Sequence, residues 1–192
     1  MRGLEQIPWL YDAMCALCER GGLARWRRWL AAGARGRTLD LGTGTGRNLP
    51  LLSADTRAIA VDPSPEALAR ARTRAPGVPL VCAAAEALPF RDRSFDTVVS
   101  GLVFCSVRDP ARALGEIRRV LRRDGELRML EHVRATVPWR ARAQDAIQPL
   151  WTRVTGGCHP NRDTEATVRR AGFVLDEQRA RGTMRRFRAR SA

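Results

Sequence analysis

The sequence predicts an α/β fold in which a seven-stranded, mostly parallel sheet is covered by helices on both faces. Short apolar runs alternate with helical patterns along most of the chain, an order typical of parallel strands joined by crossover helices. The 192 residues are enough for one such domain and too few for two. Seven runs have strand character: Thr38 to Leu41, Ala58 to Asp62, Leu80 to Ala83, Phe95 to Ser100, Leu127 to His132, Phe173 to Glu177 and Thr183 to Arg188.

The chain divides into three stretches within this one structural domain. Residues 1–36 precede the first strand and have an amphipathic pattern, so they are expected to form an N-terminal helical cap. Residues 37–192 form the sheet core. Residues 133–163 leave the alternation for a Trp-bearing helix and a Gly-rich loop, TGGCHPNRDT, which predicts a helical insertion over the top of the sheet.

Two helices of the core have clear start signals. Ser64-Pro65-Glu66 supplies a capping hydroxyl, a proline at the first helical position and a first-turn carboxylate. Asp109-Pro110 starts the next helix in the same way, and its apolar positions recur at helical spacing as far as Leu121. Asp124-Gly125 then predicts a turn into the fifth strand.

The formal net charge of +14 suggests a nucleic-acid or anionic-membrane partner. All basic residues are Arg, however, and they are scattered apart from the tail at Met184 to Arg190. A solvated Arg-rich surface is therefore favoured over a specific nucleic-acid footprint. The stretch Leu23 to Leu30 has an alternative interpretation as a helix on an anionic membrane surface, so peripheral membrane contact is the most that is expected.

The chain is expected to be cytoplasmic and free of metal. No apolar stretch reaches the length of a spanning helix, and the first residues lack the apolar region of a secretion signal. Five cysteines, an odd number, indicate free thiols. Cys15 and Cys18 share the spacing of a zinc motif, but they lie in a helical pattern where that spacing also places both residues on one apolar face.

The segment from Thr38 to Gly46 contains the most informative motif. A strand ends at Asp40 and continues through Gly42, Gly44 and Gly46 into a helix. Glycines at this turn let the backbone bend sharply and let a ligand approach without a Cβ in the way. The motif predicts a ligand site at the carboxyl edge of the sheet.

Two carboxylates indicate which ligand this site accepts. Asp40 lies inside the motif, where it would repel a pyrophosphate but suits an ammonium group. Asp62 lies 20 residues beyond Gly42 at the end of the second strand, where a carboxylate can accept hydrogen bonds from both hydroxyls of a ribose. The competing interpretation is that both residues only cap strand ends.

These motifs resemble those of class I S-adenosylmethionine-dependent methyltransferases. The resemblance rests on DLGTGTG, VDPSP around Asp62, AAAEALPF after the third strand, FDTVVSGLVFCSV on the fourth and ALGEIRRVLRRDGELRMLEHVR leading into and along the fifth. It covers roughly residues 37–135, in the manner of a methyltransferase type 11 domain. LVFCSV, LEHVR and the later GGCHPNRDT are most similar to the alkyl-thiol methyltransferase-like branch and its bacterial phospholipid-methyltransferase-like relatives.

The resemblance implies a Rossmann-like fold, S-adenosyl-L-methionine as cofactor and a set of binding residues. The methionine portion would lie on Asp40, Gly42, Thr43, Gly44 and Gly46, and the ribose on Asp62. The adenine would lie against Pro63, Ala84, Ala85 and Glu86, with Gly101 and Leu102 closing the site after the fourth strand. Many relatives carry an acidic residue at the position of Ala84, and the thiol-type branch tends to have Ala there.

Methyl transfer from a sulfonium is an in-line displacement that depends on alignment and the exclusion of water, so few catalytic residues are expected. His132 closes the fifth strand at the edge that carries the glycine motif, which makes it the candidate base. The competing interpretation is that His132 only packs at the strand end. Trp139, Trp151, His159, Asn161 and Arg162 lie in the insertion and are candidates for contacts with a small, apolar or lipid-like acceptor.

Three other functions compete with this hypothesis. A nicotinamide oxidoreductase would lack Asp40 in its glycine motif, and a chain without Lys has no Tyr/Lys catalytic pair. An RNA methyltransferase fits the charge, but the amino-directed type usually has a Pro-Pro-aromatic motif where this chain has Ser100 to Phe104. A non-catalytic module that binds nucleic acid or protein would fail to bind the cofactor.

Overall fold

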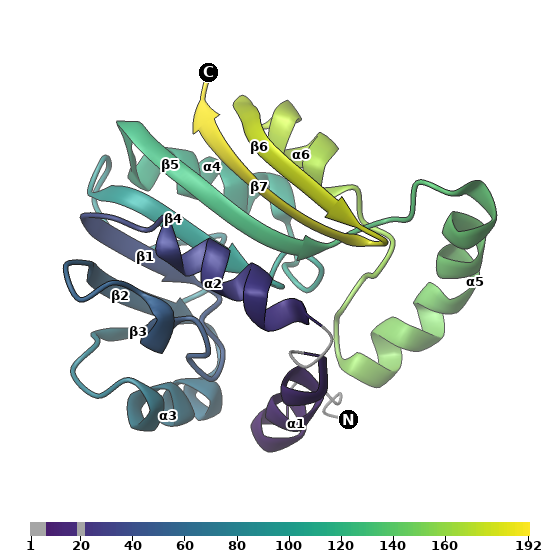
Figure 1. Ribbon diagram of the computed structural model, residues 1–192, viewed down its shortest axis with the longest axis horizontal. Helices are drawn as coiled ribbons and strands as arrows, with labels where there is room; N and C mark the ends of the chain where they lie inside the picture. Colours follow the sequence, from purple (N-terminus) through teal and green to yellow (C-terminus); the bar gives the residue numbers. More distant parts are fainter. Residues whose placement is uncertain (1–6, 19–21) are drawn as a thin grey trace.

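A single seven-stranded sheet organises the protein, as the sequence predicts. The computed structural model describes residues 7–18 and 22–192. The strand order is β3-β2-β1-β4-β5-β7-β6 (Figure 1). The strands are β1 Arg37–Leu41, β2 Arg57–Asp62, β3 Leu80–Cys82, β4 Phe95–Gly101, β5 Leu121–His132, β6 Phe173–Arg181 and β7 Met184–Ser191.

The five strands β1 to β5 are parallel to one another, and β7 runs antiparallel between β5 and β6. The apolar residues Leu39, Leu41, Val98 and Val99 of β1 and β4 are fully buried, as expected for parallel strands covered on both faces. Gly182, with φ +60, lies in the tight connection that joins β6 to β7.

The fifth strand is longer than the sequence predicts. Leu121 already pairs with Phe95, and the next pair joins Glu126 to Thr97, so β5 advances five residues while β4 advances two. The turn expected at Asp124-Gly125 is therefore an irregularity inside β5. The parallel pairing with β4 then continues to the carboxyl edge, where β5 ends at His132.

The helices are α1 Pro8–Cys18, α2 Ala24–Ala32, α3 Pro65–Arg74, α4 Pro110–Val120, α5 Pro138–Thr155 and α6 Thr164–Arg170, with a 3-10 turn, η3, at Leu49–Leu51. Both predicted caps are present: Ser64 Oγ accepts from Ala67 N at 3.2 Å, and Asp109 Oδ1 accepts from Arg112 N at 3.0 Å. Of the described helices, none is long and apolar enough to cross a bilayer.

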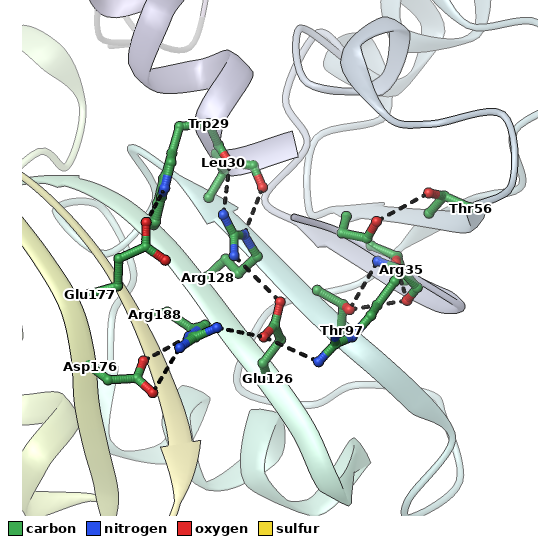
Figure 2. Close-up of polar contacts among 12 residues, drawn as sticks. Trp29, Leu30, Arg35, Thr56, Thr97, Glu126, Arg128, Asp176, Glu177 and Arg188 are labelled. Carbon is green, nitrogen blue, oxygen red and sulfur yellow. Dashed lines mark hydrogen bonds and ion pairs between the residues drawn. The ribbon is translucent and has the colours of Figure 1, made fainter. Parts of the chain in front are cut away.

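Helix α2 is fixed to the sheet by a polar network around Arg128 (Figure 2). Arg128 donates to the carbonyl oxygens of Leu30, at 3.1 Å, and Trp29, at 2.8 Å, and its guanidinium lies 4.3 Å from the centre of the Trp29 ring. Glu126 Oε1 lies 3.4 Å from Arg128 Nη1, so the buried charge is paired. These contacts satisfy carbonyls at the end of α2 that have no partner within the helix.

Helices α1 and α2 lie within the stretch expected as a cap, and α5 lies within the expected insertion. Residues 1–6 and 19–21 of the predicted cap, and the side chain of Cys18, lie outside the description. In the insertion, α5 projects away from the sheet beyond the end of β5 and the start of β7 (Figure 1). The loop after α5 returns to the carboxyl edge, where His159 N donates to Cys105 O at 2.8 Å. The whole insertion was expected to lie over the top of the sheet. In the structure only the loop after α5 lies there, and α5 itself does not.

Candidate cofactor and acceptor site

A cavity of about 1240 Å³ opens at the carboxyl edge of β1, β2 and β4. One side is formed by the glycine loop after β1, the end of β2 and the loop after β3. The other side is formed by the loop after β4 and the loop after α5. Open parallel sheets bind ligands at this edge, and the volume exceeds that of an ordinary small-molecule pocket.

Gly44 provides an open wall of this cavity. Its φ is +55, a conformation that suits glycine, and no atom lies within 4 Å of the position that a Cβ would occupy. Gly42 is restricted for a different reason, because a Cβ there would lie 2.5 Å from Cγ2 of Val103. The glycine loop therefore leaves room for a ligand at Gly44 and packs against the loop after β4 at Gly42.

Asp62 lies at the end of β2 and lines the cavity. Its Oδ2 accepts from Gly44 N and its Oδ1 from Ser64 N, each at 2.9 Å. A carboxylate offers about four lone-pair sites, so both oxygens retain capacity to accept from a ligand diol. Burial raises the pKa of Asp62, with the two backbone N–H groups opposing the shift.

Asp40 is placed differently from Asp62. Its side chain is fully buried beneath the glycine loop, where Oδ2 accepts from Thr43 Oγ1 at 2.6 Å and Oδ1 accepts from Asn48 Nδ2 at 2.9 Å. Asn48 in turn accepts from Arg27 Nη1 at 2.8 Å. Burial raises the pKa of Asp40 to about 6. Asp40 thus holds the loop in shape, and its contact with a ligand ammonium group stays a prediction.

The other predicted cofactor residues fall into two groups. Gly42, Gly44, Asp62, Pro63, Ala84, Ala85, Glu86 and Leu102 line the cavity. Thr43, Gly46 and Gly101 lie behind its wall with Asp40. A Cβ at Gly46 would lie 3.0 Å from Cα of Ala71, and one at Gly101 would lie 3.1 Å from Cδ2 of Leu30. Gly46 therefore permits close packing of α3 against the glycine loop, and Gly101 permits close packing of α2 against the sheet.

Glu131 shapes the opposite wall, a role that the sequence reasoning did not assign. Its fully buried carboxylate accepts from Ser100 Oγ at 3.1 Å, Val103 N at 3.3 Å and Phe104 N at 3.1 Å. These bonds fix the start of the loop after β4, which lines the cavity with Leu102 and Val103. Burial raises the pKa of Glu131 to about 8, against the effect of its three donors.

The loop after α5 brings His159 and Arg162 to the cavity. His159 Nδ1 lies 2.8 Å from the carbonyl oxygen of Gly157. A carbonyl only accepts, so Nδ1 carries the proton in this pair, and Nε2 of the neutral ring keeps its lone pair. Arg162 Nη1 donates to the carbonyl oxygens of Phe104 and Val107, each at 2.6 Å, which joins the two loops.

The remaining candidates lie elsewhere. Of the described residues, those that line the cavity include His159 but not His132, whose pKa is lowered by burial at the end of β5. Trp139 and Trp151 are exposed on α5 and do not line the cavity. Asn161 donates to Asp145 Oδ1 at 2.9 Å and anchors the loop to α5. A base role for His132 stays a prediction, as do acceptor contacts for Trp139, Trp151 and Asn161.

Asp12 is a second residue that sequence reasoning missed. It accepts from Thr45 Oγ1 at 2.7 Å and pairs with Arg47 and Arg74 at 3.1 and 3.0 Å, which ties α1 to the glycine loop and α3. Both omissions had a visible signal: Asp12 is the acidic residue of a largely apolar helix, and Glu131 lies next to His132 in an apolar strand. Ionisable groups in apolar segments often mark a functional or structural contact.

The comparisons with known proteins agree with this geometry. A methyltransferase domain family matches residues 39–129, which include the glycine loop, Asp62 and most of β5. The human thiol S-methyltransferase TMT1B is 33% identical over 151 residues, covering 73% of this chain and 62% of that protein. The phosphatidylethanolamine N-methyltransferase of Cereibacter sphaeroides is 39% identical over 103 residues, covering 50% of this chain and 51% of that protein.

Residues 39–129 of the chain are a methyltransferase domain, similar to that of S-adenosylmethionine-dependent methyltransferases. S-adenosylmethionine is accordingly its cofactor, and the open wall at Gly44 beside the carboxylate of Asp62 fits it. A methyltransferase from Thermotoga maritima shares the fold with a TM-score of 0.70 at 21% identity, covering 98% of this chain and 99% of that one. The chain spans about three fifths of the length of the thiol methyltransferases that it matches.

The affinity for S-adenosylmethionine should weaken as the pH falls through about 6. Burial raises the pKa values of both Asp40 and Asp62, the former to about 6, so both carboxylates take up protons at higher pH than an ordinary Asp does. The predicted contacts of Asp62 with the ribose hydroxyls and of Asp40 with a ligand ammonium group both use the ionised carboxylate, so the bound state should favour the deprotonated forms. We expect the dissociation constant to be about tenfold larger at pH 5 than at pH 7.5.

Calorimetric titration across this pH range measures the effect. Asp40→Asn should bind more weakly at neutral pH and show a shallower pH dependence, because one of the two titrating groups is gone. An affinity that stays level from pH 7.5 to pH 5 would contradict the prediction.

Proposed function

We propose that the protein transfers the methyl group of S-adenosylmethionine to the sulfur atom of a small, apolar thiol. The observation that carries the proposal is the composition of the cavity beyond the predicted cofactor residues. Its walls there include the apolar side chains of Val103 and Val107, and its polar groups include His159 and Arg162. Such a lining accepts an oily molecule and places an imidazole beside it.

The charge at this end favours a thiol over an amine. A thiol reacts as its thiolate, which a nearby positive charge stabilises, whereas an ammonium group would be repelled. Arg108 and Arg162 line this part of the cavity. The carboxylate of Glu86 also lines it, but its Oε1 accepts from the backbone N–H groups of Arg108 and Asp109, at 2.9 and 3.1 Å.

The residues of the chain have separate tasks in this reaction. When bound, S-adenosylmethionine supplies an electrophilic methyl group. His159 takes the proton of the acceptor thiol at Nε2, while the Gly157 carbonyl holds Nδ1–H and fixes the ring. The positive charge of Arg162 favours the thiolate. Glu131 holds the loop after β4, so that the apolar walls align the sulfur and exclude water.

A phospholipid amine is the second candidate acceptor. The similarity to the phosphatidylethanolamine N-methyltransferase of Cereibacter sphaeroides supports it, and the cavity is large enough to admit part of a lipid. The amine must lose its proton next to two Arg residues before it can react. Their positive charge makes loss of the proton easier, but it also weakens binding of the initial ammonium form.

Transfer of a labelled methyl group to a panel of acceptors tests the proposal. The panel contains short and long alkyl thiols, vesicles of phosphatidylethanolamine, a quinol and RNA. We expect label in the thiol products, increasing with the length of the alkyl chain, and none in RNA. Label in phosphatidylethanolamine without label in any thiol would contradict the proposal and favour the lipid amine. Failure to bind S-adenosylmethionine, with no transfer to any acceptor, would favour a non-catalytic module.

A further inference from the structure

Helix α5 turns its polar side chains toward the protein. Gln144 Oε1 accepts from Ala135 N at 2.7 Å, Asp145 pairs with Arg134 and accepts from Asn161, and Thr152 donates to Cys158 O at 2.8 Å. A surface helix of a globular protein ordinarily buries its apolar stripe and exposes its polar face. The polarity of α5 is therefore reversed.

The outward face of α5 is apolar. Positions 139, 143, 147, 150 and 154 follow one another at intervals of three or four residues and so share one face. Trp139 is 66% exposed, Leu150 65% and Ile147 55%, with Trp151 and Val154 exposed beside them. Large exposed apolar surfaces of this kind mark sites that meet another apolar phase.

Positive charge borders this face. Arg140, Arg142 and Arg153 are exposed on α5. The acidic residue of the helix, Asp145, is paired with Arg134 and accepts a hydrogen bond from Asn161. The pattern of an apolar face with tryptophans and an arginine border is that of a helix lying in the interface of an anionic bilayer.

Helix α1 extends the apolar surface. Trp9 is 60% and Leu17 69% exposed, and Ala13 and Ala16, on the same face, are exposed between them. Its acidic residue, Asp12, turns inward to Arg47 and Arg74. Both α1 and α5 therefore pair their acidic residue with arginines of the protein and direct apolar groups outward.

The two helices flank the mouth of the cavity. Pro8, at the start of α1, and Gly156 and Gly157, which follow α5, belong to the cavity lining. Figure 1 shows α1 and α5 beyond the same end of the sheet, the end to which the parallel strands point. A surface that contacts both apolar faces would lie close to the entrance.

We propose that the outward faces of α5 and α1 bind the surface of an anionic phospholipid bilayer, so that the cavity draws an apolar acceptor from the membrane. The arginine border selects this occupant, because anionic headgroups complement it while the apolar side chains enter the interface. Acceptor delivery rests on the proposed function, whereas bilayer binding does not and is measured separately.

Co-sedimentation with vesicles tests the binding. The full chain should sediment with vesicles of phosphatidylcholine and phosphatidylglycerol and much less with vesicles of phosphatidylcholine alone. The double variant Ile147→Glu with Leu150→Glu should lower the partition coefficient by about tenfold or more, since it places two charges on the inserting face. Val174→Glu is the matched control, because Val174 is 59% exposed on β6, away from α5, and should bind as wild type does.

A second pair of variants tests the charge. Arg142→Ala with Arg153→Ala should weaken binding to the anionic vesicles and make the remaining binding less sensitive to salt, whereas Arg123→Ala, exposed at the start of β5, should do neither. Circular dichroism of each variant verifies that it is folded.

Two outcomes would overturn the inference. One is equal vesicle binding by wild type and the Ile147→Glu, Leu150→Glu variant. The other is a dimer that this double variant converts to a monomer, with no vesicle binding by either, which would assign the face to a second copy of the chain. Transfer to a water-soluble thiol, measured with the same variant, reports on the proposed function alone and should be unchanged.

Discussion

Replacing Asp62 with Ala should weaken S-adenosylmethionine binding by about 100-fold or more. The ribose diol would lose two charge-assisted hydrogen bonds, each worth about 1.5 to 3 kcal/mol. The substitution also removes the acceptor of Gly44 N and Ser64 N, which hold the glycine loop and the start of α3 in place. Both effects act on the same wall of the cavity, so binding should suffer more than folding.

Titration calorimetry measures this loss, and thermal unfolding verifies that the variant is folded. Asp55→Ala is the matched control, because Asp55 is an exposed carboxylate in the loop before β2 that does not line the cavity. The affinity of the Asp62→Asn variant should lie between those of Asp62→Ala and Asp55→Ala, since an amide oxygen accepts a hydrogen bond but carries no charge. Binding of wild-type strength by the Asp62→Ala variant would remove Asp62 from the cofactor site.

The strands and the glycine loop are readable in the sequence because their signals are local. Apolar runs, capping residues and the spacing from Gly42 to Asp62 depend on the conformation of a few neighbouring residues. Ser64 and Asp109 cap their helices as predicted. The position of β7 between β5 and β6 and the irregular start of β5 depend on pairing between distant segments, which no local pattern specifies.

Which side chains reach the cavity is less readable, for the same reason. Its position at the end of a strand suggested Asp40 as a ligand contact. The glycine loop instead folds over Asp40, and its carboxylate accepts hydrogen bonds from Thr43 and Asn48. The tryptophans of α5 suggested an apolar pocket, because helices usually bury apolar residues. The inward face of α5 instead carries polar side chains that form hydrogen bonds with the backbone of the loops on either side. Gln144 Oε1, for example, accepts a hydrogen bond from Ala135 N.

The two histidines show how a tertiary contact decides a candidate role. His132 ends β5 at the correct edge of the sheet, but its ring is partly buried and does not line the cavity. His159 lies on a loop whose position depends on contacts with Cys105 and, through Arg162, with Phe104. The sequence alone marks His159 only as a residue of the insertion.

Replacing His159 with Ala should therefore lower kcat for a thiol acceptor by about 100-fold, within the usual range for loss of a general base. The dissociation constant for S-adenosylmethionine should stay close to that of wild type, because His159 is not a predicted cofactor residue and most of those residues lie on the glycine loop, the end of β2 and the loop after β3. The deficit should shrink as the pH rises past about 8.5, where a free thiol ionises without a base.

His132→Ala is the matched control, since it removes an imidazole that does not line the cavity, and its rate at neutral pH should be close to that of wild type. Steady-state kinetics with the same thiol, over a range of pH, separates the two variants. A large loss in His132→Ala with normal rates in His159→Ala would transfer the base role to His132. Equal rates in wild type, His159→Ala and His132→Ala at neutral pH would show that neither imidazole acts as a base. Catalysis would then come from alignment by the cavity walls and from the positive charge of Arg162, which favours the ionised thiol.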